Sequence, residues 1–442
     1  MSDGTKSERR IGNQPDGGNE DQAGLSDSVF DRPTMAILAA LILGYSTEHA
    51  LSQTKEITAA PLNLLWSQIV PYDWPPAQEE KGLVLVDILR SPDSLKAILA
   101  NADGRPSLLL DADESGPGRS IPLPLGGKDL HIAGNGSGGY WIGGEINRHM
   151  IGIAPHYVSD GYLAKISATG NAIWEHRFGN RNERSIQSLA GLPSGEVVVS
   201  GRNDDATWLA KISEGGEVLW EKFFGVAKGS SVIAVGELIF VAAFSATHES
   251  DFYKYQDDLS LWIFDGAGTL VERRVIRNAI NRKSSSAFGK IFLQSEGDDI
   301  YLSSLWSDSF GAIKSTEVVK LDREGKTIWQ KEVLDTSPPS SGPATIGLPS
   351  NCTNGMAIIS PGDPVILCGK KGATVLFRLS SKTGEVTKIV VPHSHSGCQS
   401  NASPALFLAR KNEQTVFILG SRRGHFGESC TWMGEVFGEA WK

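Results

Sequence analysis

The stretch "GYLAKISATGNAIWEHRFG" at residues 161–179 returns, little changed, as "TWLAKISEGGEVLWEKFFG" at residues 207–225. In each copy apolar and polar residues alternate, a short turn with glycine follows, and the alternation resumes. A period of two is typical of a β-strand with one buried face. Each copy therefore predicts a β-hairpin whose glycine permits the backbone conformation of the turn.

Weaker copies of the same hairpin recur along the chain. The turn glycines of the five copies are Gly170, Gly216, Gly268, Gly325 and Gly384, and they lie 46, 52, 57 and 59 residues apart. A second kind of hairpin alternates with them, at residues 185–201, 231–244, 289–305, 357–369 and 405–420. Four strands in each 46 to 59 residues are typical of a β-propeller blade.

The fold class expected is therefore all-β, a β-propeller of four-stranded antiparallel blades. No amphipathic helical pattern interrupts the chain from residue 129 onward, which excludes a βαβ sheet. We expect seven blades, with six as the alternative, because residues 94–111 contain an Asp-Gly turn between two apolar runs. The final blade lacks its fourth strand, which we expect from the N-terminal portion of the chain, with residues 120–124 as the candidate; such closure would remove the open edge of the ring.

The two best copies resemble the repeats of secreted and cell-surface β-propellers. Those repeats have the pattern D-x-W-L-x-K-L-D-x-x-G-x-x-x-W, followed by S-I-x-x-x-x-D-G-G-Y-x-V-x-G. The chain also resembles, more distantly, the pyrroloquinoline-quinone-type repeat, through Thr169, Gly170 and Trp174. The resemblance covers residues 129–225 well and fades toward residue 430. It implies the fold, but not a function, because propellers serve many roles.

The stretch "HIAGNGSGGYWIGG" at residues 131–144 contains G-x-G-x-x-G, the spacing of a dinucleotide-binding loop. Such a loop must open a helix, whose N-terminus holds the pyrophosphate. Here an aromatic and β-branched run follows the glycines instead. We therefore expect Gly134, Gly136, Gly138 and Gly139 to form the turn between the first two strands of a blade.

The N-terminal part of the chain differs in composition from the rest. Residues 1–34 are polar and Gly-rich, and we expect them to be disordered. Residues 35–52 begin with eleven apolar residues and end near the small residues Ala50 and Ser52, as a signal peptide does; a membrane anchor is the alternative. We expect residues 53–93 to be a linker or N-terminal extension and residues 94–442 to be the propeller. The expected location is exported: periplasmic, cell-surface or secreted.

The long connections are expected at one end of the blades. Turns between strands 1 and 2 and between strands 3 and 4 share one face, and they are short here. The other face receives the long loops at residues 147–160, 245–258, 333–351 and 392–404. Long irregular loops in a compact fold usually bind something. The candidate binding residues on this face are His149, His156, His248, Phe252, Tyr253, Tyr255, Trp306 and His425.

The four cysteines all lie in the last quarter of the chain. An even number in an exported protein suggests disulfides. We predict Cys352–Cys368 and Cys398–Cys430, because each pair brackets a hairpin; four reduced core thiols are the alternative.

Candidate metal ligands are few, and no cofactor is predicted. His393 and His395, near Cys398, could hold a transition metal, although loop histidines are more often solvated. The acidic residues Asp204–Asp205, Asp251, Asp257–Asp258 and Asp298–Asp299 could hold calcium, although they lack EF-hand spacing and are commoner as turn formers.

The sequence favours a binding or scaffold module that acts through its long-loop face. Its ligand would be a protein, a small molecule or a glycan, and residues 35–45 could tether it to a membrane. A net charge of −9 argues against nucleic acid. The alternative is an enzyme, hydrolase or quinoprotein-like, at the mouth of the central channel. Catalysis is less expected, because the G-x-S-x-G and H-E-x-x-H motifs are absent.

Overall fold

The structure is a computed structural model. It describes residues 57–61, 63–70, 84–90, 95–100, 108–113, 116–123, 128–149, 157–179, 184–225, 227–246, 257–277, 291–307, 313–335, 355–360, 362–370, 373–393, 405–411, 415–423 and 429–436. The chain divides into two units, residues 1–53 and 54–442, and every described residue belongs to the second. The described residues contain no helix that could span a membrane.

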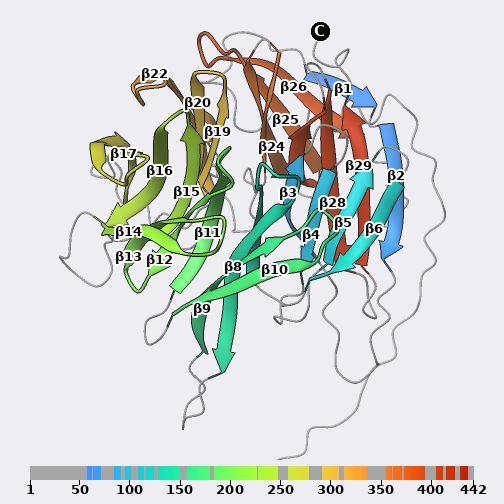
Figure 1. Ribbon diagram of the computed structural model, residues 1–442. Coiled ribbons are helices and arrows are strands. Elements are labelled where there is room, and N and C mark those ends of the chain that lie inside the picture. The colour runs from blue at the N-terminus through green and yellow to red at the C-terminus, as the bar shows by residue number, and fades with distance from the viewer. Residues whose placement is uncertain are drawn as a thin grey trace, which may run out of the picture. The chain divides into compact units, whose positions relative to one another are not determined.

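The described strands form seven sheets, six with four strands and one with five (Figure 1). We number these sheets as blades 1 to 7 in chain order. Blade 1 contains β3 (Val84–Arg90), β4 (Leu95–Ala100), β5 (Leu108–Asp113) and β6 (Gly116–Pro122). Blade 2 contains β7 (Lys128–Gly134), β8 (Tyr140–His149), β9 (Tyr157–Ile166) and β10 (Ala172–Phe178). Blade 3 contains β11 (Arg184–Gly191), β12 (Val197–Asn203), β13 (Ala206–Ile212) and β14 (Val218–Phe224).

The remaining blades follow the same order. Blade 4 contains β15 (Ala227–Val235), β16 (Leu238–Ala246), β17 (Asp257–Asp265) and β18 (Leu270–Arg277). Blade 5 contains β19 (Ile291–Glu296), β20 (Asp299–Ser307), β21 (Ile313–Leu321) and β22 (Thr327–Asp335). Blade 6 contains β23 (Met356–Ile359), β24 (Asp363–Lys370), β25 (Ala373–Leu379), β26 (Val386–His393) and, at its outer edge, β1 (Ile57–Pro61). Blade 7 contains β27 (Ala405–Arg410), β28 (Val416–Arg423), β29 (Ser429–Val436) and β2 (Asn63–Val70).

The first strands of the blades form a closed ring. β3 contacts β7, and contacts continue in order through β11, β15, β19, β23 and β27, which contacts β3 again. If only the six four-stranded sheets were counted as blades, the propeller would have six blades, the alternative number. The five-stranded sheet contains the same antiparallel unit of four strands, and it brings the ring to seven. The predicted fold, a β-propeller of four-stranded antiparallel blades, is confirmed.

The ring is completed by the N-terminal part of the second unit. β2 pairs antiparallel with β29 as the outer strand of blade 7, and β1 pairs parallel with β26. The prediction that an N-terminal strand completes the last blade is confirmed, but the suggested segment was wrong, because most of residues 120–124 belongs to β6, the outer strand of blade 1. Residues 53–93 were expected to be a linker or N-terminal extension, and they contribute β1, β2 and β3. A pairing between strands more than 350 residues apart leaves no local pattern in a sequence.

The hydrophobic core lies between neighbouring blades. Five clusters of buried residues each join two consecutive blades, from blades 1 and 2 to blades 5 and 6. Between blades 2 and 3, for example, Trp141 and Trp208 are fully buried and Phe178 packs against Trp208 with ring centroids 5.1 Å apart. A blade is therefore buried on both faces, one against each neighbour, and not on one face as the alternation predicted: β12, for example, is buried at five consecutive positions.

Candidate functional site

The ends of the blades differ in how their strands are joined. We call the end that carries the connections between strands 1 and 2 and between strands 3 and 4 the short-turn end. Its longest connection is residues 380–385, between β25 and β26. The opposite end, which we call the long-connection end, carries residues 150–156, 247–256, 278–290, 336–355 and 394–404. The predicted division between short turns and long loops is confirmed by the strand bounds.

The apparent dinucleotide-binding stretch is a turn at the short-turn end. β7 ends at Gly134 and β8 begins at Tyr140, as predicted. The Asn135 side-chain oxygen accepts hydrogen bonds from the backbone N–H groups of Ser137 and Gly139, at 3.0 and 2.8 Å. A Cβ on Gly139 would lie 2.4 Å from the carbonyl oxygen of Ile166. Close backbone approach at Gly139 and positive φ angles at Gly136 and Gly138 account for these three glycines without a nucleotide.

The five repeat glycines have one role in common. Each lies between the third and fourth strands of its blade with a positive φ, from 71° at Gly384 to 94° at Gly216. Side chains other than glycine rarely adopt this conformation. The repeat identified in the sequence is therefore the turn of the outer hairpin, as predicted.

Tryptophans on the outer strands join each of three blades to the next. Trp174 donates from its indole N–H to the carbonyl oxygen of Glu214 at 3.0 Å, and Trp220 does the same to Gly266 at 3.2 Å. Trp329 donates to Ser381 at 2.9 Å. In each case the acceptor lies in the short turn of the following blade. We call this arrangement the tryptophan clasp.

Lysines on the third strands reinforce the clasp. Each tryptophan lies opposite a lysine, as Trp174 does with Lys165. Lys165 is buried, and its Nζ lies 2.7 Å from the Glu214 carboxylate of the next blade. Leu163, two positions before Lys165, opposes His176.

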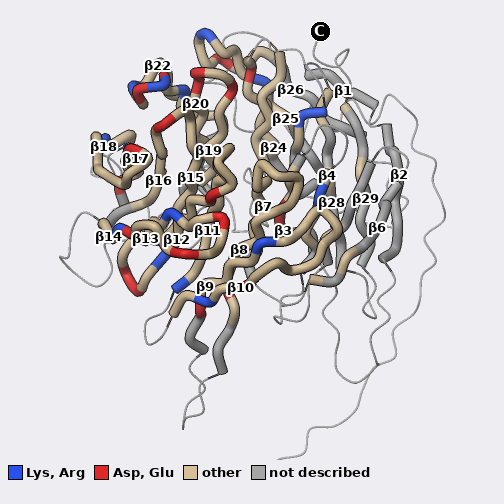
Figure 2. The backbone as a smooth tube through the Cα atoms, in the orientation of Figure 1, with Lys and Arg blue, Asp and Glu red and all other residues tan. Residues whose placement is uncertain are grey.

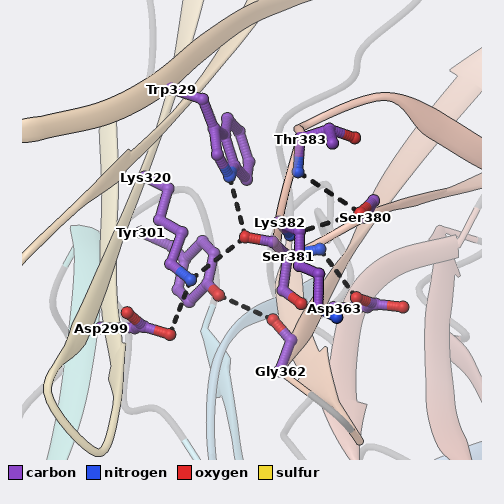
Figure 3. Close-up of polar contacts among 10 residues, drawn as sticks. All are labelled: Asp299, Tyr301, Lys320, Trp329, Gly362, Asp363, Ser380, Ser381, Lys382 and Thr383. Carbon is purple, nitrogen blue, oxygen red and sulfur yellow. Dashed lines mark hydrogen bonds and ion pairs between the residues drawn. The ribbon is translucent and has the colours of Figure 1, made fainter.

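The contact between blades 5 and 6 shows the clasp most fully (Figure 3). Lys320 donates to the Ser381 carbonyl oxygen at 3.1 Å and pairs with Asp299 at 2.8 Å. The Tyr301 hydroxyl donates to the Gly362 carbonyl oxygen at 2.7 Å. Burial, aided by the Asp299 carboxylate, raises the pKa of Tyr301 well above its usual range, so the hydroxyl stays a donor. These groups hold the short-turn end together.

Blade 4 departs from this pattern. Ile263 and Glu272 stand opposite each other at the lysine and tryptophan positions, so no clasp joins blade 4 to blade 5 there. A Cβ on Gly325 would meet Ile263 instead of an indole. The blades are joined near the other end by a buried ion pair, with Arg277 of β18 3.0 Å from Glu317 of β21.

A row of polar side chains joins the inner strands around the ring. Asp87 of β3 accepts the backbone N–H of Ile132 in β7 at 2.9 Å. Likewise Ser188 of β11 accepts from Val232 at 3.1 Å, and Ser231 of β15 accepts from Leu293 at 3.2 Å. An inner strand has one edge without a neighbouring strand in its own sheet, so these oxygens satisfy backbone groups that would otherwise lack a partner.

One imidazole joins this row. His131 Nδ1 lies 3.5 Å from Asp87 Oδ2, and both side chains are partly exposed. A carboxylate beside an imidazole can orient it for proton transfer. Among the residues that the structure describes, no group of three or more His, Cys, Asp or Glu side chains is arranged to hold a metal.

Some of the residues predicted for binding, metal ligation or disulfides lie in described strands, and others do not. His149, Trp306 and His393 lie at or near the long-connection ends of β8, β20 and β26, in three different blades. Cys368 and Cys430 lie in β24 and β29. The others fall outside the described residues: His156, His248, Phe252, Tyr253, Tyr255, His395, His425, Cys352 and Cys398.

The acidic residues proposed for calcium have other roles where they are described. Asp299 pairs with Lys320, and Asp298 lies 4.0 Å from Arg323. Asp204 and Asp205 form the turn between β12 and β13, where Asp204 has a φ of 51°. Asp258 is buried in β17, next to Asp257. Asp251 lies outside the described residues.

The polar row of the inner strands was not anticipated from the sequence. Its strongest signal is "VLVDILR" at residues 84–90, where Asp87 interrupts an apolar strand. A carboxylate in such a run must find a partner when it is buried. Ser188 and Ser231 give no comparable signal, because serine is common in strands and turns alike.

Comparisons with known proteins find similarity in structure but not in sequence. No family model matches the chain, and no curated protein matches it. Among solved structures, the polysaccharide lyase Uly1 is 10% identical with a TM-score of 0.53, and the match covers 85% of this chain and 100% of that one. The β-propeller domain of the Trilobed protease from Pyrococcus furiosus is 14% identical with a TM-score of 0.43, covering 80% and 94%. BBS1N, in complex with ARL6DN, is 8% identical with a TM-score of 0.47, covering 86% and 98%.

Proposed function

We propose that this protein is an exported binding module whose ligand lies on the long-connection end of the propeller. One observation supports this most directly: connections of more than six residues between described strands occur at that end alone. Long irregular connections are costly in conformational entropy, and they commonly carry binding residues on a rigid scaffold.

The short-turn end supports the same proposal, because its polar groups are engaged within the protein. Its turns are held by the tryptophan clasp and by lysines whose charges are already paired, as Lys165 is with Glu214. Lys211 likewise pairs with Glu196 at 2.7 Å, and that bond holds the pKa of Glu196 below its usual range. Charged groups that are already paired, across blades as Lys165 and Glu214 are or within one blade as Lys211 and Glu196 are, are not free for a ligand.

The chain offers a matched way to test the proposal. Asn203 and Ala206 pair directly across the two-residue turn at 204–205, and Ala246 and Asp257 pair in the same way across residues 247–256. Replacing residues 247–256 with Asp-Asp should therefore leave β16 and β17 in register. The control is Glu217→Ala with Glu324→Ala, two exposed turn positions at the short-turn end.

The full chain, the graft variant and the control are each immobilised, and the proteins that each one captures are compared by quantitative mass spectrometry. The same three proteins are also applied to a glycan array. We expect the graft to lose specific binding and the control to keep it, with equal melting temperatures. Binding that survives the graft and is lost in the control would place the ligand at the short-turn end and refute the proposal.

A second candidate is an enzyme acting at the inner strands, and the Asp87–His131 pair is the observation that favours it. Polysaccharides are the first substrates to assay, because the Uly1 structure, a polysaccharide lyase, has a similar fold. Cleavage by the full chain that is lost in His131→Gln, without loss of folding, would support catalysis. Lack of cleavage at high enzyme concentration would leave the binding module as the better account.

We also propose that residues 35–52 direct export and that the cysteines form the pairs Cys352–Cys368 and Cys398–Cys430. Composition supports both, through the apolar run and the even number of cysteines. N-terminal sequencing of the exported protein and peptide mapping without reduction test them. A retained N-terminus would indicate an anchor, and four alkylated cysteines would refute the disulfides.

A further inference from the structure

The exposed apolar side chains are confined to the outer strands of four consecutive blades. In the described part of the chain, the large hydrophobic residues that are substantially exposed are Ile173, Val218, Leu219, Phe223, Leu270, Val271, Val275 and Ile328. They belong to β10, β14, β18 and β22, each the last strand of its sheet. An edge strand with exposed apolar residues is a template for pairing with another strand.

β1 shows that an outer edge of this propeller accepts a further strand. It pairs with β26 from Ile57 opposite Ile389 to Pro61 opposite His393, and blade 6 gains a fifth strand. The edge of β18 has no such partner in the described part of the chain. Leu270, Val271 and Val275 are 50%, 59% and 50% exposed there.

The sequence of β18 is complementary to itself. The run Leu270–Ile276 reads Leu-Val-Glu-Arg-Arg-Val-Ile, and its centre is Arg273. Two copies paired antiparallel about that centre place Leu270 opposite Ile276, Val271 opposite Val275 and Glu272 opposite Arg274. Apolar residues then face apolar residues, and carboxylates face guanidinium groups on both sides of the centre. Opposite partners of these kinds stabilise a strand pair.

We propose that β18 pairs with β18 of a second copy of this chain, so that two propellers form a dimer with two-fold symmetry. The pairing is isologous, the commonest arrangement of homodimers. At the position where blades 2, 3 and 5 have the clasp tryptophan, β18 has Glu272, and this residue belongs to the proposed pairing. β14 does not offer the same match, because pairing it about its central Glu221 places Trp220 opposite Lys222, where β18 places opposite charges.

One residue pair in the proposed interface is unfavourable, and its replacement should strengthen the interface. Arg273 faces Arg273 of the second copy across the axis. Each guanidinium also lies 5.1 Å from the ring of its own Trp262, which draws it toward its own sheet. Figure 2 shows β18 at the left margin of the view, beside β17. A strand pair of this length is small for a protein interface, so the dimer should depend on concentration.

The decisive experiment exchanges the charges of β18 in the full chain. Glu272→Arg alone and Arg274→Glu alone each place like charges opposite one another, and the double variant restores opposite charges in reverse order. Sedimentation equilibrium over a range of protein concentrations measures the dissociation constant. We expect at least a tenfold weaker dimer for each single variant and recovery to within about threefold of the starting value for the double variant.

A second variant keeps the test sharp if charge reversal disturbs folding. Arg273→Thr removes the repulsion at the axis, and we expect it to tighten the dimer several-fold. A monomer at all concentrations, for both the starting protein and Arg273→Thr, would overturn the proposal. A dimer indifferent to all four variants would overturn it equally, by placing the interface elsewhere.

Discussion

Single residues at the short turns explain why the repeat has the sequence it has. A turn glycine of one blade lies against the aromatic or aliphatic side chain of the preceding blade, as Gly384 does against Trp329. The indole then donates to the carbonyl oxygen of the same turn. A Cβ on the glycine would occupy the space of the ring, so a tryptophan in one blade requires glycine in the turn of the next.

The first prediction concerns the indole of Trp329. Trp329→Phe keeps most of the buried ring but removes the N–H that bonds to Ser381. The free energy of unfolding should fall by about 1–2 kcal/mol, from one lost hydrogen bond and a small loss of packing. Urea unfolding measures it. The matched control is Trp329→Ala, which should cost about 3–5 kcal/mol. A Phe variant as stable as the starting protein would show that the clasp bond contributes nothing.

The second prediction concerns acid stability. Asp265 accepts backbone N–H bonds from Thr269 and Ala267 in its turn, and the bond from Thr269 does most to lower the pKa of Asp265 in the folded protein. A folded-state pKa below the unfolded one stabilises the fold above the unfolded value, and this stabilisation is lost as the pH falls through the folded value.

Asp265→Asn retains the acceptor oxygen but does not titrate. The difference in stability between the starting protein and Asp265→Asn should therefore be present at neutral pH and should diminish as the pH falls below the usual range of an aspartate. Thermal unfolding across pH measures it. A difference that is constant across pH would contradict the assigned cause.

At the scale of elements, the contact between blades 4 and 5 uses a different device from its neighbours. Glu272 replaces the clasp tryptophan, and the buried pair of Arg277 and Glu317 joins the blades instead. Gln330 donates to the second carboxylate oxygen of Glu317 at 2.7 Å. Both charges are thus held by partners in a site from which water is largely excluded.

The third prediction tests that pair. Arg277→Met leaves the Glu317 carboxylate buried without its cation, and it should reduce the free energy of unfolding by about 3–5 kcal/mol. The double variant, with Glu317→Met added, should lose clearly less than the sum of the two single variants, because no unpaired charge remains. Additive losses, measured by chemical unfolding, would show that the two side chains do not act as a pair.

The hairpins and their turn glycines could be predicted from the sequence because strand alternation and turn chemistry are local. Closure by an N-terminal strand could be predicted, but not that the strand is β2, because its partner β29 lies at the other end of the chain. The polar row of the inner strands could not be predicted from the sequence for a related reason. Ser188 and Ser231 accept from residues of the next blade, and nothing near them in the sequence specifies that neighbour. The binding residues proposed on the long loops remain predictions.

At the scale of the whole molecule, closure of the ring depends on β2. Blade 7 would otherwise end at β29 with an exposed edge, and the contact between the last and first blades would be weakened. The fourth prediction follows. Removal of residues 1–53, the first unit, should leave the melting temperature unchanged, whereas removal of residues 1–72 should lower it sharply and promote aggregation. Equal melting temperatures for the two truncations would show that β2 is not needed for closure.

The measurement that tests the central claim most directly is site-specific photo-crosslinking from the two ends of one blade. A photoreactive residue replaces Asp205, exposed at the long-connection end of blade 3, or Glu217, exposed at its short-turn end. Both proteins are irradiated in the presence of the native extracellular or envelope material, and adducts are identified by mass spectrometry. A saturable adduct from position 205 and none from position 217 is the predicted result. A saturable adduct from position 217 alone would contradict the account.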